Sequence, residues 1–395
     1  MTMRRVSLSD VCDVTDGTHY TPPNTGGPFP FLTVKDMTDK GLSFSGCSYI
    51  DAAEFEKARK VAACPESGAV LFSKDGTVGK VHVVRHERPF ATLSSIAILR
   101  PDIRRLDSHY LGFALGNSAI LKDAVDRKTG SALQRIILAD LKEISIPLPD
   151  LPEQRRIAGR LERADRLRRT RRYALKLTNT FLPAAFLELF GETDDRFPTS
   201  TVNELAADKP HAIRTGPFGS QLLHSEFTDS GIAVLGIDNA VNNEFAWDQR
   251  RFITPAKYEQ LKRYTVFPGD VIITIMGTCG RCAIVPDDIP TAINTKHLCC
   301  ITLAASDCLP IYFHGAFLFH PFIRRQLGVA TKGAIMDGLN MEIIRGLRIP
   351  VPPLSLQQKF AALVERVERL RAVQREALRQ AEHLFASLLH RAFIG

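Results

Sequence analysis

The stretch IPLPDLPEQRRIAGRLERADRLRR (residues 146–169) occurs a second time as IPVPPLSLQQKFAALVERVERLRA (residues 349–372). The two copies align without a gap at an offset of 203 residues, so that Gln154 corresponds to Gln357. Self-similarity at a fixed spacing indicates a duplicated structural unit. The repeat therefore predicts two copies of one arrangement, in which a globe of about 150 residues is followed by about 40 helical residues.

Both copies continue into long helical patterns. In the second copy, a series that begins at Phe360 and ends at Leu388 recurs every seven residues, interleaved with a second series from Leu363 to Leu384. This spacing is typical of the a and d positions of a coiled coil. The first copy is weaker because arginines interrupt the pattern. The residues expected to pair the helices or to bind a partner are Ile157, Leu167, Phe181, Phe360, Leu363, Val367, Leu370 and Leu384.

Two arrangements of these helices remain open. If they pair antiparallel, the globes lie at opposite ends and are related by a pseudo-twofold axis. Alternatively, each helix packs only on its own globe, and periodicity alone does not decide between the two.

Upstream of each helix the repeat is fainter but ordered. GTVGKVHVV (76–84) matches GTCGRCAIV (277–285), and YIDAAEFEKARK (49–60) matches FITPAKYEQLKR (252–263). Strand-like runs such as AVLFSK and DVIITIM are separated by glycine-rich turns. Each globe should therefore mix helices and strands.

We predict an α+β fold in which two pseudo-symmetric α/β globes are separated by two long antiparallel coiled-coil helices. Short helices are expected at 52–60 and 107–126. The predicted divisions are a first globe, a first spacer helix, a second globe and a second spacer helix, at 1–150, 151–191, 192–353 and 354–395.

The composition is that of an ordinary globular protein, with 395 residues, 45% hydrophobic and 24% charged. Eight cysteines are too few for a disulfide framework, and the start MTMRRVSLSDVC lacks the apolar run of a secretory signal. No segment approaches the ~18 uninterrupted apolar residues of a membrane span. We therefore expect a reduced, cytoplasmic location and no membrane.

The formal net charge of +8 suggests an anionic partner, but its distribution weakens that inference. Residues 151–191 carry +6 and residues 354–395 carry +3, which leaves −1 for the globes. The excess charge thus lies on the predicted helices, where acidic protein surfaces, phosphates or solvent can meet it.

Three features together resemble the specificity subunit of Type I restriction-modification systems. They are the repeated proline-rich start with its long helix (146–190 and 349–393), DGTHYTPP (16–23) and GPFGSQL (216–222). The first is similar to the helical spacer regions of that family, and the other two are similar to the openings of its two target recognition domains. The resemblance covers the whole chain.

The resemblance implies a non-catalytic reader of double-stranded DNA. In that family each target recognition domain reads a few base pairs of a bipartite, asymmetric site, and the paired helices set the unread spacer. The helices dock two methyltransferase subunits, which modify adenine at N6, and the assembly can recruit two ATP-driven restriction subunits. This subunit then needs no cofactor, and S-adenosylmethionine, ATP and magnesium belong to its partners.

Enzyme motifs are missing from the sequence. It has no methyltransferase-type glycine-rich loop, no Asp or Asn followed by Pro-Pro-Tyr and no HExxH, and GTVGK lacks the flanking residues of a P-loop.

A CxxC with later ligand-type residues could hold zinc, namely Cys279, Cys282, His297, Cys299 and Cys300. Because Val78 and Val81 occupy the CxxC positions in the first copy, buried free cysteine is the preferred interpretation, and we predict no metal.

Glycine-rich turns with cations suit close approach to a phosphate backbone, although an ordinary hairpin turn looks the same. The loop of the first globe that contains Gln134 and Arg135 is a better candidate for base reading than the corresponding loop of the second globe, because these side chains can bind adenine and guanine edges bidentately. The predicted DNA-facing residues are His19, Tyr20, Lys74, Thr77, Lys80, Lys128, Ser131, Gln134, Arg135, Arg214, Ser220, Gln221, Thr278, Arg281, Lys296 and Lys332.

Other functions fit the same pattern. A specificity subunit of a methylation-only or Type IIB-like system would have the same architecture, because the difference lies in its partners. From a different class, a coiled-coil scaffold that binds only protein would also need two long helices.

Overall fold

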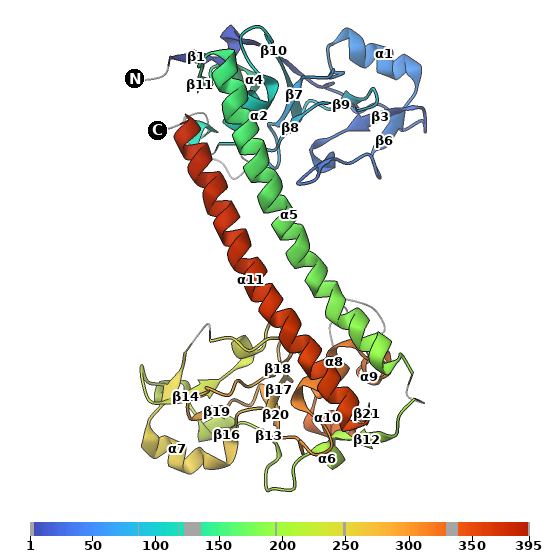
Figure 1. Cartoon of the computed structure of the whole chain (residues 1–395). Coiled ribbons are helices and arrows are strands. Elements are labelled where there is room, and N and C mark those ends of the chain that lie inside the picture. Colours follow the sequence, from blue (N-terminus) through green and yellow to red (C-terminus); the bar gives the residue numbers. More distant parts are fainter. Residues whose placement is uncertain are drawn as a thin grey trace. The chain divides into compact units, whose positions relative to one another are not determined.

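The computed structural model describes residues 4–85, 87–117, 119–121, 136–193, 196–247, 250–328 and 339–393. The chain divides into two compact units: the first contains Met1–Tyr173 and Glu376–Gly395, and the second contains Ala174–Arg375. Each unit thus combines one globe with a part of each of two long helices (Figure 1). Within the described ranges, no helix has the combined length and apolar character that crossing a membrane requires.

The first unit is built around an antiparallel sheet with the order β2-β10-β7-β8. The strands are β2 (Cys12–Asp16), β10 (Ile96–Pro101), β7 (Val70–Ser73) and β8 (Val81–Val83). Successive side chains of a strand point to opposite faces. Phe72 therefore packs in one apolar cluster and Leu71 in another, which leaves β7 buried throughout.

Smaller elements complete the first unit. A second sheet has the order β6-β3-β9, in which β3 and β9 are parallel. Its strands, two further strand pairs and the first short helix are β3 (Phe29–Leu32), β6 (Ser48–Ile50), β9 (Ala91–Thr92), β4 (Met37–Thr38) with β5 (Gly41–Leu42), β1 (Arg5–Ser7) with β11 (Ser145–Pro147), and α1 (Ala52–Lys60).

The second unit repeats this topology. Its main sheet has the order β13-β20-β17-β18, and its second sheet has the order β15-β14-β19-β16 with β14 and β19 parallel. The strands are β13 (Ile213–Thr215), β20 (Leu298–Ile301), β17 (Val271–Thr274), β18 (Cys282–Ile284), β15 (Phe252–Ile253), β14 (Ile232–Leu235), β19 (Ala292–Asn294), β16 (Thr265–Val266), and β12 (Thr199–Thr201) with β21 (Arg348–Pro350). The predicted mixture of helix and sheet, written twice, is confirmed.

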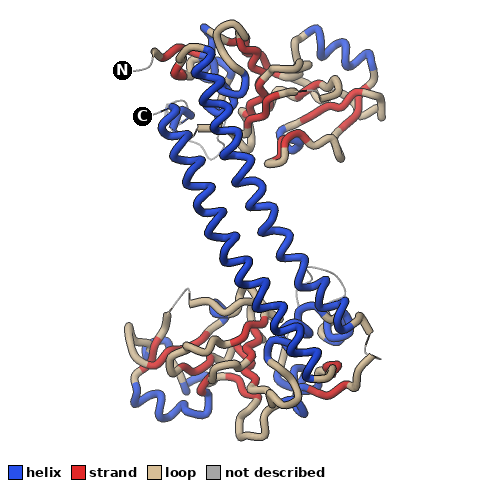
Figure 2. The backbone as a smooth tube through the Cα atoms, in the orientation of Figure 1, coloured by secondary structure: helices blue, strands red, loops and turns tan. Residues whose placement is uncertain are grey.

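Short helices lie at the sheets of both units (Figure 2). The predicted helix at 52–60 is α1, and the helix predicted at 107–126 begins as α2. The capping residue Asp51 of α1 accepts a hydrogen bond from the Glu54 amide, and Thr254 does the same for Lys257 in α7. The bounds are α2 (Ser108–Leu115), α4 (Leu138–Lys142), α6 (Val202–Leu205), α7 (Pro255–Leu261), α8 (Pro310–Phe319), α9 (Pro321–Gln326) and α10 (Met341–Gly346).

Two 40-residue helices, α5 (Leu151–Phe190) and α11 (Leu354–Phe393), confirm the long helices that the repeat predicts. Leu161 near the start of α5 packs in the core of the first unit, whereas Phe190 at its end packs in the core of the second. α11 does the reverse, and its Phe393 packs on Tyr110 of the first unit. The alternative in which each helix packs only on its own globe is therefore wrong.

Within each unit, the α5 and α11 segments run antiparallel. In the first unit, Arg172 pairs with Glu382 (Nη2 to Oε1, 2.7 Å), and the earlier Arg168 lies over the ring of the later Phe385 (3.9 Å). In the second unit, the Phe186 and Phe360 rings meet at 5.2 Å. Residue numbers thus rise along one helix as they fall along the other.

The helix seam has a different register from the predicted one. Val367 is buried at a predicted a position, but the predicted d residues Leu370 and Leu384 are 52% and 45% exposed. The position four residues after Val367 faces α5 instead: Arg371 is 8% exposed and donates to the Thr178 carbonyl (2.8 Å). A stripe that is apolar at three of seven positions does not distinguish these two registers, which explains the error.

Candidate nucleic-acid interface

Three loops meet at one end of the main sheet in the first unit. They are the segment after β2, the β7–β8 turn and the segment between β9 and β10. The Lys74 amide donates to the Ser95 carbonyl (3.0 Å), and the Ser94 amide donates to the Thr18 carbonyl (2.8 Å). The Ile136 amide then donates to the Lys74 carbonyl (2.9 Å). DGTHYTPP and GTVGK, which are distant in sequence, therefore form one surface.

A hydroxyl group closes the β7–β8 turn in the same way in both units. The Ser73 Oγ donates to the Thr77 carbonyl (2.6 Å) and accepts from the Lys80 amide (2.7 Å). In the second unit Thr274 takes this role, and its Oγ1 accepts from the Arg281 amide (2.9 Å). The turn joins two paired strands in each unit, so it is a hairpin turn that presents an equivalent cation.

Glycines make both loop clusters possible. Gly79 and Gly280 have φ values of 93° and 78°, a region that side chains disfavour. A Cβ on Gly17 would lie 2.3 Å from the Thr92 carbonyl oxygen, and one on Gly216 would lie 2.1 Å from that of Asn294. Both domain-entry loops are thus held directly against the neighbouring segment.

The second unit gathers the corresponding loops. The Thr215 Oγ1 donates to the Lys296 carbonyl (3.1 Å), and the Ile275 amide donates to the His297 carbonyl (2.9 Å). GPFGSQL and GTCGR therefore lie on either side of residues 295–297, as the repeat would require.

Several predicted residues of the first unit lie on this surface. His19 and Thr77 are exposed. Tyr20 is also exposed, and its hydroxyl donates to Glu54 Oε2 (2.8 Å). Lys80 is half-buried and its ammonium donates to the Met37 carbonyl (2.6 Å), so the side chain is held in place at the surface.

The predicted residues of the second unit lie at the matching surface. Thr278 and Arg281 in the hairpin turn are exposed, and Lys296 is half-buried. Ser220 and Gln221 are exposed on the short 3₁₀ helix Gly219–Gln221, and the Gln221 side-chain oxygen accepts from the Tyr264 hydroxyl (2.8 Å).

Two predicted residues are corrected. Lys74 is buried and pairs with Asp16 Oδ1 (3.2 Å). Arg214 is also buried, and its guanidinium is bound to the Asp270 carboxylate. A cation neutralised inside the protein does not reach a phosphate, so we remove both from the candidate interface. Five further predicted residues lie outside the described ranges, namely Lys128, Ser131, Gln134, Arg135 and Lys332.

Two exposed apolar side chains at this surface were missed by the sequence reasoning. Phe218 is 50% exposed and Met276 is 39% exposed. The repeat contained a signal for Phe218, because Phe218 stands two residues after Gly216 just as the predicted residue His19 stands two residues after Gly17.

The cysteines do not converge on a metal site. Cys282 and Cys299 pack in one apolar cluster, whereas Cys300 points to the opposite face of β20 and packs in another. Burial raises the pKa of Cys299 to about 12 and raises those of Cys282 and Cys300 well above the ordinary value. These cysteines are free, and burial disfavours the thiolate form that zinc binds. Across the described residues, no three His, Cys, Asp or Glu side chains are grouped for a metal ion.

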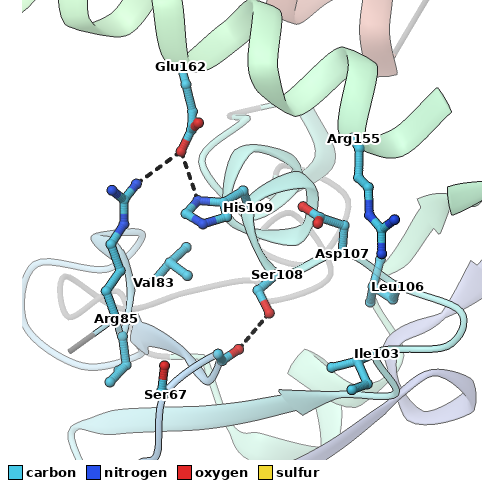
Figure 3. Close-up of a pocket in the computed structure, with 12 residues that line it drawn as sticks. Ser67, Val83, Arg85, Ile103, Leu106, Asp107, Ser108, His109, Arg155 and Glu162 are labelled. Atoms are coloured by element: carbon cyan, nitrogen blue, oxygen red, sulfur yellow. Dashed lines mark hydrogen bonds and ion pairs between the residues drawn. The ribbon is translucent and has the colours of Figure 1, made fainter. Parts of the chain in front are cut away.

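A pocket of about 400 Å³ in the first unit lies beneath α5, beside α2 and β8 (Figure 3). Glu162 of α5 binds Arg85 (2.9 Å) and His109 (2.9 Å), and the Ser108 hydroxyl donates to the Gly68 carbonyl (2.6 Å). The two contacts of Glu162 attach α5 to the globe. Glu365, the repeat partner of Glu162, instead pairs with an arginine of its own helix.

The predicted helix residues divide into two groups. Ile157, Phe360 and Val367 are buried, and Leu363 is half-buried. The other four are exposed by 41% or more, namely Leu167, Phe181, Leu370 and Leu384. Exposed apolar residues at helical spacing leave part of the surface of each long helix suited to a protein partner.

Comparisons with known proteins point to one family. The family model described as the Type I restriction modification DNA specificity domain matches residues 2–177 and again residues 220–383. The specificity subunit of the Type I restriction enzyme MjaVIII from Methanocaldococcus jannaschii is 21% identical over 383 residues, which cover 93% of this chain and 86% of that protein. The EcoBI specificity subunit of Escherichia coli is 24% identical over 301 residues, which cover 69% of this chain and 62% of that protein.

Solved structures show the same fold. The chain resembles the S subunit of a Type I restriction-modification system from M. genitalium with a TM-score of 0.59 and 14% identity, covering 100% of this chain and 97% of that one. It also resembles a chain solved in work on complex assembly and conformational transition of the Type I restriction-modification system, with a TM-score of 0.61 and 18% identity, covering 98% of this chain and 97% of that one.

Proposed function

This chain belongs to the family of Type I restriction-modification specificity subunits, and we propose that its two globes each read one half of a bipartite, asymmetric site in double-stranded DNA. Specificity subunits of this family are non-catalytic. The chain accordingly selects the DNA sequence, and partner subunits perform the chemistry with S-adenosylmethionine, ATP and magnesium, while this subunit needs no cofactor.

One observation carries the proposal: each unit builds the same loop cluster on its own main sheet, with different side chains at some of the matching positions. Thr77 and Lys80 of the first unit match Thr278 and Arg281 of the second, whereas the exposed His19 is matched by the exposed Phe218. Cations that contact phosphates position a reader, while neighbouring polar side chains contact base edges. Two globes with one backbone and different side chains would read two different half-sites.

The long helices supply the remaining parts of the proposal. Their exposed apolar residues would dock two methyltransferase subunits, and the +6 charge of residues 151–191 would favour acidic surfaces or spacer phosphates. We also propose that the assembly recruits two restriction subunits and works in the cytoplasm. The predicted division into 1–150, 151–191, 192–353 and 354–395 assigns a reader role to the first and third parts.

The experiment is methylation mapping with the reconstituted complex of this chain and its methyltransferase subunits. We expect N6-methyladenine within a single bipartite, asymmetric motif. Titration of the complex with matching and scrambled duplexes should show sequence preference. A protein-binding scaffold would give methylation or binding without sequence preference, which would contradict the proposal. Cleavage of unmodified DNA with ATP and the restriction subunits separates a restriction system from a methylation-only one.

A further inference from the structure

We propose that Phe218 and Met276 form an apolar contact that reads thymine methyl groups in the half-site of the second unit. The inference rests on the proposed function and names the surface that gives the two half-sites different readouts. Both side chains belong to loops that the sheet of the second unit brings together.

The two residues lie on adjoining loops. Phe218 follows β13, whose last residue Thr215 donates to the Lys296 carbonyl (3.1 Å). Met276 follows Ile275, whose amide donates to the His297 carbonyl (2.9 Å). The segment 296–297 thus connects the backbones that present the two side chains.

Their exposure is not an effect of loose loops. Phe218 is 50% exposed although its amide donates to the Gln221 side chain (3.3 Å), and that side chain is held by the Tyr264 hydroxyl. Met276, at 39% exposed, begins a hairpin turn that the Thr274 hydroxyl closes. Large apolar side chains that fixed backbones hold in solvent on two adjoining loops form a candidate binding surface.

The first unit carries polar residues at the matching positions. His19 stands two residues after Gly17, as Phe218 does after Gly216, and Asp75 precedes Gly76 as Met276 precedes Gly277. The duplicated backbone therefore presents an imidazole and a carboxylate in one unit and a phenyl and a thioether in the other. At these two positions, only the second unit presents apolar side chains.

The DNA group that fits is the C5 methyl of thymine. It is the apolar group on a base edge, and it faces the major groove, where side chains from the loops of the second unit can contact it. Arg281 ends the same turn and Lys296 lies in the adjoining segment, so cations flank the apolar pair and can hold the phosphates.

The test uses the full complex with its methyltransferase subunits and duplexes in which single thymines are replaced by deoxyuridine. This replacement removes only the methyl group. We expect one or two positions in the second half-site to weaken binding roughly three- to fivefold each, the effect of losing one buried methyl group. Replacements in the first half-site should have little effect.

Variants assign the effect to the two side chains. In Phe218→Ala or Met276→Ala complexes, thymine and deoxyuridine duplexes should bind equally at the affected position. Phe218→Leu and Met276→Leu keep an apolar surface and should retain part of the discrimination, which separates loss of contact from misfolding. Phe267→Ala is a matched control, because Phe267 is 43% exposed in the same unit but lies just before β17, at the opposite end of that strand from the Met276 turn.

Uniform tolerance of deoxyuridine throughout the second half-site, with sequence-specific binding intact, would overturn this inference and leave the proposed function standing. Unchanged thymine discrimination in both alanine variants would also overturn it. Absence of any sequence preference in the unsubstituted complex would instead contradict the proposed function.

Discussion

At the scale of single residues, an arginine–threonine pair joins the same two neighbouring strands in both units, but the arginine is on one strand in the first unit and on the other strand in the second. In the first unit, Arg100 of β10 donates to the Thr15 hydroxyl of β2 (2.8 Å). In the second unit, Arg214 of β13 donates to the Thr302 hydroxyl that follows β20 (3.1 Å). Each unit thus pairs one arginine with one threonine, with their places exchanged, and Arg214 is a core residue although it stands beside the GPFGSQL motif.

Arg214 and Arg281 should therefore respond oppositely to replacement. Arg214→Ala leaves the buried Asp270 carboxylate without its cation, and we expect a loss of about 3 to 5 kcal/mol in the free energy of unfolding. Arg281→Ala should change that free energy by less than about 0.5 kcal/mol, yet weaken DNA binding by the complex. Urea denaturation and salt-dependent titration measure the two effects. Comparable destabilisation by both variants would refute the distinction.

His314 makes the second unit sensitive to acid. Its Nε2 donates to the Asn243 carbonyl (2.9 Å) and the Cys282 carbonyl (3.0 Å), and burial lowers the pKa of the imidazole below its ordinary 6.5. As the pH falls through 6.5, His314 becomes protonated in the unfolded chain but stays neutral in the folded chain. Folding stability from this group is therefore present above that pH and is lost below it.

The variant His314→Gln keeps a donor and removes the titration. We expect its free energy of unfolding to fall less than that of the unsubstituted chain between about pH 7.5 and pH 5.5, by at most about 1.4 kcal/mol per pH unit. Thermal denaturation at several pH values provides the comparison. Parallel curves for the two proteins would mean that another group causes the acid sensitivity.

At the scale of elements, one glutamine fixes the start of each long helix. The Gln154 amide nitrogen donates to the carbonyls of Arg105 and Pro149, and its oxygen accepts from the Asp107 amide. Gln357 makes the equivalent three bonds in the second unit. Each side chain is fully buried, so the repeated glutamine joins its helix to the segment that begins α2 or α8.

Replacement of either glutamine should affect only its own unit. Gln154→Ala leaves buried backbone groups without partners, each worth about 1 to 3 kcal/mol. We expect faster hydrogen exchange in α2 (Ser108–Leu115) and unchanged exchange in α8, with the reverse for Gln357→Ala. Equal effects of each variant on both units would show that the glutamines do not act locally.

The helix seam shows which part of an element the pattern could predict. Seven-residue spacing established the helices and the buried series through Phe360 and Val367. It selected Leu370 for the seam although the partner helix contacts Arg371. A charged residue in a seam is acceptable because Thr178 and Glu368 accept its hydrogen bonds, and Thr178 is 193 residues away in the sequence.

At the scale of the whole molecule, we predict that helix length sets the spacer between half-sites. Inserting four residues into both α5 and α11 lengthens each helix by ~6 Å. The recognised spacer should grow by about one or two base pairs, given ~3.4 Å for each base pair. Methylation mapping of the reconstituted complex measures it.

Insertion of seven residues into both helices provides a second variant, because it preserves the heptad register and adds ~10.5 Å, or about three base pairs. Insertion into one helix alone should disrupt the pairing and abolish specific methylation. An unchanged spacer in both paired variants would contradict the role of the helices as a ruler.

Local sequence patterns were enough to establish the duplication, the two long helices and the loops GTVGK and GTCGR, because repeats and periodicity are properties of the chain itself. Which side chains those loops expose depended on packing between distant segments. Arg214 was drawn inside by Asp270, 56 residues away, and Phe218 was left in solvent by a loop held against residues 294–296. Whether a residue is buried depends on which distant segments pack around it in the folded chain, and the residue type alone does not determine this.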